Sequence, residues 1–205
     1  MIDMTPIQDI DENTWQTIVQ KATHDVRNLL AILQNYSEVA LQSKGKDTSF
    51  LTEKIAREGL RVARETDIFF DFLSFRSYPL MLSLENCSLS EILTSVDTWM
   101  RTQFSQKTFT LLLPPLNTEC IVDKRLFSSA ILAFTICCLN DLNSGDTLIY
   151  GAESKHTQIR YFFQSSHTIN SSASFLFLYA LEILRLHHIR ITPSNILTKE
   201  FYFHL

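Results

Sequence analysis

The chain has 205 residues, of which 45% are hydrophobic and 20% are charged, and its formal net charge is -4 at pH 7. This composition is typical of a globular protein rather than a disordered one, and the length suits two small domains. The slight negative charge argues against nucleic acid and anionic membranes as partners, because both are met by basic surfaces.

Neither the N-terminal residues nor the longest apolar stretch suggests export or membrane insertion. The acidic N-terminal dozen residues lack the basic and apolar regions of a signal peptide. The longest apolar stretch, residues 126–139, is too short to span a bilayer and predicts a buried helix. We therefore expect a cytoplasmic protein.

The cysteines do not follow a metal-binding pattern. No C-x-x-C spacing occurs among Cys87, Cys120, Cys137 and Cys138, and the two adjacent ones point to different sides of a helix. We interpret all four as reduced, structural residues. No compact set of metal ligands is present elsewhere, so we expect neither a metal nor a cofactor in the chain itself.

Residues 11–43 predict a long amphipathic helix that ends near Gly45. Its apolar side gathers Trp15, Ile18, Val19, Ala22, Val26, Leu29, Leu30, Leu33 and Ala40. Each residue turns the helix by about 100°, so His24 lies opposite this stripe, on the polar face with Asn28 and Ala31. A histidine there is reached by water, and it is either an incidental surface residue or a reactive one.

A second helix is predicted from a cap at Asp47-Thr-Ser to about Phe75. Its apolar positions are Phe50, Leu51, Ile55, Leu60, Val62, Ile68, Phe69 and Phe72. Two long helices joined by a short loop form an antiparallel hairpin. One hairpin cannot cover two full apolar stripes, so we expect a homodimer that pairs two hairpins in a four-helix bundle.

The second helix also carries a basic stripe, formed by Lys54, Arg57, Arg61 and Arg64. We favour a solvated face with local ion pairs at four-residue spacing, Glu53 with Arg57 and Lys54 with Glu58. The alternative is a docking surface for an acidic partner, in which Arg57 and Arg61 would take part.

Pro79 ends the hairpin and suggests a boundary between domains 1–78 and 79–205. The second domain predicts an α+β pattern, with strands at 80–84, 109–113 and 120–122, a helix over 88–104, and the buried helix capped by Asp123. A turn at 143–146, paired strands at 148–151 and 158–164, a helix over 175–188 and closing strands at 189–191 and 201–205 complete it.

The motif His24-Asp25-x-Arg27-Asn28 resembles the phosphoacceptor box of the sensor histidine kinases, in their dimerisation and histidine-phosphotransfer domain. That box usually continues with a proline, and Leu29 in its place predicts a straighter helix. The order of elements after residue 79 resembles the ATP-binding domain of the same kinases. The resemblance implies a helical hairpin followed by an α/β sandwich.

The nucleotide site of those kinases is not matched. The segment beginning Asp123-Lys-Arg125-Leu126 resembles the one that holds their nucleotide-binding asparagine, but it offers only Ser128, Ser129 and Thr135 before Asn140. The chain has four glycines and none after residue 151, so the loops at 164–170 and 171–174 lack the residue that lets backbone N–H groups approach phosphates.

A phosphoacceptor box without a nucleotide site is similar to the kinase-derived, ChpT-like histidine phosphotransferases. The resemblance implies an enzyme that relays a phosphoryl group between receiver aspartates of response regulators through His24, with Mg²⁺ supplied by the receiver. The alternatives are a non-catalytic scaffold that binds receivers or a kinase, and a histidine kinase with a rebuilt nucleotide site.

The same resemblance implies roles for the neighbours of His24. Asp25 would hydrogen-bond the imidazole or accept its proton, unless it is a plain surface acid. Asn28 would orient water against an aspartyl phosphate, unless it is only part of a polar face. Arg27 would neutralise phosphate or form a salt bridge. Leu30 and Ala31 would contribute an apolar docking surface one to two turns below.

Overall fold

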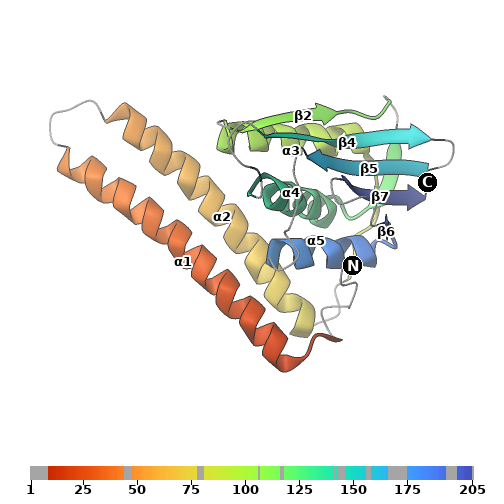
Figure 1. The fold of residues 1–205 in the computed structure, drawn as a ribbon, viewed down its shortest axis with the longest axis horizontal. Coiled ribbons are helices and arrows are strands. Elements are labelled where there is room, and N and C mark those ends of the chain that lie inside the picture. The colour runs from red at the N-terminus through yellow and green to blue at the C-terminus, as the bar shows by residue number, and fades with distance from the viewer. Residues whose placement is uncertain are drawn as a thin grey trace.

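The computed structural model describes residues 9–43, 48–77, 81–105, 107–115, 118–140, 142, 146–155, 158–165, 175–192 and 198–204. Two long helices, α1 (Glu12–Gln42) and α2 (Ser49–Ser77), form an antiparallel hairpin. Figure 1 shows the hairpin beside an α/β domain, with its loop end projecting beyond that domain. The expected domain boundary at 78/79, Gly45 and Asp47 lie outside the described residues.

The first helix begins where the sequence indicates. The side chain of Asp11 accepts a hydrogen bond from the Thr14 amide at 3.0 Å, which satisfies one of the free donors of the first turn. Ala22 and Leu29 are buried against the rest of the chain, as predicted. Leu30 is 48% exposed, so its assignment to the buried stripe was wrong: Leu29 takes the inward position, and the next residue turns toward solvent.

The second helix buries its C-terminal half. Ile68, Phe69, Phe72 and Phe75 belong to the core of the molecule, whereas Phe50 and Leu60, nearer the loop, are 63% and 59% exposed. The predicted apolar positions of α2 therefore divide into a half that is buried in the core and a half, nearer the loop, that stays largely exposed.

The strands of the described residues form two sheets. A two-stranded antiparallel ribbon joins β1 (Glu85–Ser88) to β3 (Glu119–Val122). A five-stranded sheet has the order β2-β4-β5-β7-β6, with bounds β2 Thr108–Leu112, β4 Thr147–Lys155, β5 Gln158–Ser165, β6 Arg190–Thr192 and β7 Thr198–His204. The neighbours β2 and β4 are parallel, and the remaining pairs are antiparallel.

Three helices accompany the sheets: α3 (Leu89–Gln103), α4 (Lys124–Asn140) and α5 (Phe175–Leu186). The cap predicted at Asp123 is confirmed, because its side chain accepts from the Leu126 amide, and Ser88 caps α3 by accepting from the Glu91 amide. Every residue of α4 from 129 to 139 is buried, which confirms the predicted core helix. The fold class and the order of elements agree with the sequence-based expectation, apart from the bounds of the first strand.

The strand predicted at 80–84 is wrong. Residues 81–84 are not in a strand, Met81 is 92% exposed, and β1 begins only at Glu85. The physical reason is the register with β3, in which Glu85 pairs with Val122, the last residue of that strand. The side chain of the next residue, Asp123, accepts a hydrogen bond from the Ser83 amide at 3.0 Å. Residues before Glu85 therefore bond to the capping residue of α4 and not to a neighbouring strand.

All four cysteines are buried and free of disulfides. Burial raises the pKa of Cys120 to about 11, so this thiol is neutral at physiological pH. These observations agree with the structural role predicted for them.

Gly151 is required by the close approach of two strands. A Cβ built on it would clash with the Leu112 carbonyl oxygen of the neighbouring strand, and its φ is +156°. We expect Gly151→Ala to lower the free energy of unfolding by more than about 2 kcal/mol, measured by urea denaturation.

Gly59 provides the matched control for that substitution. In the helical environment of α2 its Cβ would meet nothing nearer than Leu33 Cδ1 at 4.0 Å. Gly59→Ala is expected to raise the free energy of unfolding by about 0.5–1 kcal/mol through helix propensity. Equal effects of the two alanines would contradict the strand geometry at Gly151.

His187 follows α5 and joins that helix to Asp123 as a neutral ring. Its Nε2 accepts the Asp123 amide at 2.9 Å, so Nδ1 carries the proton and donates to the Ile183 carbonyl at 2.8 Å. Burial lowers the pKa of His187, because charging the ring is costly there and would break the bond to Asp123. His188, with φ 56°, closes the helix in the left-handed conformation.

The lowered pKa of His187 predicts a pH-dependent stability. The unfolded chain binds this proton near pH 6.5 and the folded chain only at lower pH, so stability is complete above about 6.5 and falls as the pH decreases toward the folded value. Denaturation midpoints between pH 5 and 7.5 should fall on acidification in the wild type and fall less in His187→Gln. Identical slopes would contradict the neutral link.

Candidate functional site

The imidazole of His24 projects from the outward face of α1. Its side chain is 71% exposed, whereas Ala22 and Leu29 on the opposite face are buried. The orientation predicted from helical periodicity is therefore confirmed. A macromolecule can reach the ring without any movement of the described elements.

Both contacts of the ring involve the same nitrogen. His24 Nδ1 lies 3.4 Å from Asp25 Oδ1 and 3.1 Å from Asn28 Nδ2. The Asn28 amide turns its N–H₂ group toward Nδ1, which accepts that hydrogen bond when it carries no proton, whereas a protonated Nδ1 donates to the Asp25 carboxylate. The tautomer that donates to Asp25 leaves Nε2 with a free lone pair, which is the arrangement that a nucleophilic imidazole needs.

The Asp25 carboxylate is positioned to respond to charge on the ring. It is 47% exposed, and its distance from Nδ1 exceeds that of a charge-assisted hydrogen bond. An imidazolium formed by attack at Nε2 would draw the carboxylate closer, since opposite charges attract more strongly than a neutral pair.

Arg27, Leu30 and Ala31 surround the histidine on the exposed side of α1. Within the described part of the chain Arg27 forms no ion pair, so its guanidinium is available to an anion. Leu30, with 48% exposure, and the small Ala31 give an accessible apolar area on the turns that follow His24. The structure thus brings Asp25 and Asn28 into contact with His24, and it leaves Arg27, Leu30 and Ala31 exposed on the same helix within two turns of the ring.

The basic residues of α2 are engaged locally. Arg57 pairs with Glu53 at 2.6 Å, as the local interpretation predicts, and also donates to Ser105 Oγ at 3.2 Å. Arg61 pairs with Glu65 at 2.9 Å and lies over the Phe104 ring at 5.3 Å. Both guanidinium groups are therefore turned toward the end of α3.

The contacts of Lys54 differ from those predicted for the basic stripe, and Glu65 beside the stripe has an altered pKa. The Lys54 ammonium lies over the rings of Tyr36 and Phe50, at 5.2 and 4.9 Å, and does not pair with Glu58. Burial raises the pKa of the Glu65 carboxyl despite its partner Arg61, and the negative charge of Asp25 on the neighbouring helix adds to the rise.

An aromatic junction joins the hairpin to the second domain, and sequence reasoning missed it. Phe72 stacks on Trp15 with ring centroids 5.0 Å apart and meets Phe175 edge-on at 6.0 Å. Phe75 stacks on Tyr179 at 5.4 Å. The signal was present in the density of aromatic residues at 68–75 and 175–179, but helix periodicity does not reveal that these two runs meet.

Polar contacts accompany the aromatic ones. Asp71 Oδ2 accepts from Arg125 Nη1 at 2.9 Å and from the Tyr179 hydroxyl at 3.4 Å. Arg64 donates to Ser129 Oγ at 3.0 Å. Burial raises the pKa of Tyr179, which keeps the hydroxyl protonated as a donor. The second domain is thus held to α2 by side chains of α4 and α5.

The hydroxyl groups of α4 are occupied as well. Ser128 and Thr135 donate to backbone carbonyls of their own helix, at Lys124 and Ile131, and Ser129 accepts from Arg64. Among the described residues no three His, Cys, Asp or Glu side chains gather as a metal site. The predicted loops at 164–170 and 171–174 lie outside the described residues, apart from residues 164 and 165. No described helix has the length and apolar character to cross a membrane.

No family model and no curated protein matches the sequence. Solved structures do match in fold. The histidine kinase AdeS of Acinetobacter baumannii aligns with a TM-score of 0.60 and 14% identity, over 87% of this chain and 95% of that one. The histidine kinase ThkA, in complex with the response regulator TrrA, aligns with a TM-score of 0.55 and 13% identity, over 96% and 67%.

A structure described as a bacterial phosphotransferase aligns over nearly the full length of both chains, 96% of this one and 98% of the other, with a TM-score of 0.51 and 12% identity. At such identities the likeness concerns the fold. The chain therefore has the fold of the dimerisation and phosphotransfer hairpin of histidine kinases followed by their ATPase-like α/β domain.

Proposed function

We propose that this chain is a histidine phosphotransferase of a two-component phosphorelay, and that His24 carries the phosphoryl group between receiver aspartates. The observation that carries the proposal is the exposed imidazole whose Nδ1 is contacted by Asp25 and Asn28 and whose Nε2 is open to a partner. The kinase-like fold supports it.

The chemistry is two phosphoryl transfers in sequence. The lone pair of His24 Nε2 attacks the phosphorus of an aspartyl phosphate on the donor receiver, the P–O bond breaks, and the donor carboxylate leaves with its electron pair. The Nδ1 proton stays in its hydrogen bond to Asp25, which stabilises the charged ring. The phosphoryl group then passes to the carboxylate of the acceptor receiver, and neutral His24 is restored.

Such transfers depend on in-line positioning and on charge neutralisation. In this proposal Arg27 meets the phosphoryl oxygens, Asn28 fixes the ring, and Mg²⁺ comes with the receiver rather than with this chain. We further propose that the second domain is a degenerate ATPase domain and that the protein is not an ATP-dependent kinase, because the chain has no glycine after residue 151 to let backbone N–H groups approach phosphates.

The partner contacts follow from the exposed surface. We assign the central contact with a receiver to Leu30 and Ala31. Arg57 and Arg61 stay in their local ion pairs, and they attract an acidic partner only through their positive charge. The four buried cysteines, none of which forms a disulfide, support a cytoplasmic location, where cysteines remain reduced.

The loop half of the hairpin supports a homodimer. It projects beyond the second domain (Figure 1) and exposes large apolar side chains, among them Val39 at 49%, Leu41 at 77% and Phe50 at 63%. A second copy would bury these residues in a four-helix bundle.

The test is transfer of radiolabel to the purified full chain from a panel of phosphorylated receiver domains with Mg²⁺, beside a reaction with labelled ATP alone. Acid-labile label that comes from a receiver and not from ATP is expected. Label from ATP would identify a kinase with a rebuilt nucleotide site. Receivers that bind without transferring label would identify a scaffold.

A further inference from the structure

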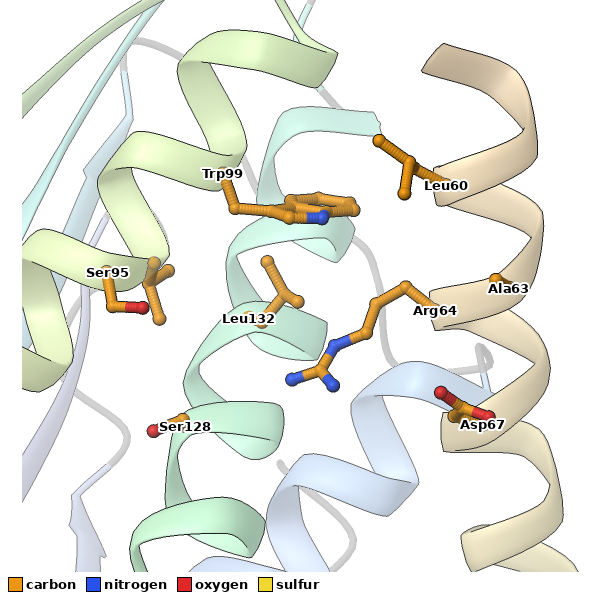
Figure 2. Close-up of a pocket in the computed structure, with 9 residues that line it drawn as sticks. Leu60, Ala63, Arg64, Asp67, Ser95, Trp99, Ser128 and Leu132 are labelled. Atoms are coloured by element: carbon orange, nitrogen blue, oxygen red, sulfur yellow. The ribbon is translucent and has the colours of Figure 1, made fainter. Parts of the chain in front are cut away.

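A cavity of about 290 Å³ lies between α2, α3 and α4, where the hairpin meets the second domain. Figure 2 shows side chains from all three helices turned into it. None of its lining residues belongs to the site around His24. Its volume is near the lower end of the range for ligand pockets in proteins, which suits a compound of one or two rings.

The walls of the cavity are largely apolar. Leu60 enters from α2, Leu132 from α4, and the Trp99 indole extends from α3 toward α2 (Figure 2). A flat indole face beside two leucines favours an aromatic ligand, because ring stacking and apolar burial both contribute.

The polar part of the cavity carries the positive charge of Arg64. Arg64 reaches from α2 toward α4 (Figure 2), and one of its terminal nitrogens is fixed by the Ser129 hydroxyl at 3.0 Å. Within the described residues no carboxylate pairs with this guanidinium. A guanidinium with free donors beside an apolar pocket favours a carboxylate ligand, which it can bind with two N–H groups.

Asp67 limits how much negative charge the ligand can carry. It lines the same cavity, one turn along α2 from Arg64, and does not form an ion pair with it. A second or third negative charge on the ligand would meet repulsion from this carboxylate in a partly enclosed space. Phosphates and nucleotides are thereby disfavoured against a single carboxylate.

We propose that the cavity binds a small aromatic monocarboxylate, held by Arg64 at the carboxylate and by Trp99, Leu60 and Leu132 at the ring. Because the cavity is formed by helices of both domains, bound ligand stabilises their observed arrangement and raises the unfolding temperature of the chain. The proposal is independent of phosphotransfer at His24.

The test uses indole-3-acetate and benzoate as probes, and tryptamine as the control that keeps the indole ring but carries a cation. The full chain, labelled with ¹⁵N, has two indole N–H signals, from Trp15 and Trp99, and Trp99→Phe assigns them. Either acid is expected to shift the Trp99 signal saturably while the Trp15 signal stays in place, and tryptamine is expected to leave both unchanged.

Two variants and a matched control locate the binding. Arg64→Gln should weaken acid binding about 10-fold or more, consistent with loss of a charge-assisted pair. Leu60→Trp, at a position that is 59% exposed, should fill the cavity and abolish binding, whereas Leu84→Trp, at a position of matched 56% exposure away from the cavity, should not. The proposal is overturned if neither acid binds at millimolar concentrations, if tryptamine binds as well as the acids, or if Leu60→Trp binds like the wild type.

Discussion

Replacing His24 by glutamine is expected to remove all acid-labile label that the chain receives from a phosphorylated receiver. Glutamine keeps a polar side chain of similar reach on the exposed face of α1 but has no nucleophilic nitrogen, so no phosphoramidate can form. Because the His24 side chain is 71% exposed and supports no buried contact, the variant should fold with the stability of the wild type. The loss would therefore report chemistry and not misfolding.

The control for this variant is Gln20→Ala, an exposed position one turn before His24 on the same helix. It should accept label at the wild-type rate. Transfer of label to His24→Gln at an undiminished level would locate the acceptor on another residue and refute the assignment. Loss of label in both variants would point to a general defect of α1 and would equally remove the support for His24.

The hairpin and the exposure of His24 were predictable because they depend on local periodicity. A repeat of 3.6 residues fixes which side chains share a face once the helix forms, and α1 lies within one residue of the predicted bounds at each end. The contacts of Asp25 and Asn28 with His24 follow from the same spacing, since neighbours at one and four positions lie beside the ring.

Other features depend on residues far apart in the sequence and were not predictable from it. The start of β1 is set by its register with β3, some thirty residues away, and not by the apolar alternation at 80–84. The neutral state of His187 depends on the Asp123 amide, 64 positions earlier. The meeting of Phe72 with Phe175 joins the two domains across about half of the chain.

That meeting makes Phe72 the position where a core substitution should have the largest effect. Its side chain is completely buried, stacks on Trp15 of α1 and packs edge-on against Phe175 of α5. Phe72 therefore links α2 both to the other helix of the hairpin and to the second domain. Phe72→Ala should lower the free energy of unfolding by about 3–5 kcal/mol, through lost burial and the cavity left behind. Urea denaturation followed by circular dichroism measures it.

Phe70, two residues away on the same helix, is the control because it is 63% exposed. Phe70→Ala removes the same atoms from a solvated position and should change stability by no more than about 1 kcal/mol. Equal losses in the two variants would contradict the junction. A large loss at Phe72 in a single cooperative transition would mean that the hairpin and the second domain unfold together, since the buried core runs through both. The histidine would then be presented on a rigid support, as the proposed relay requires, because in-line transfer depends on fixed positions.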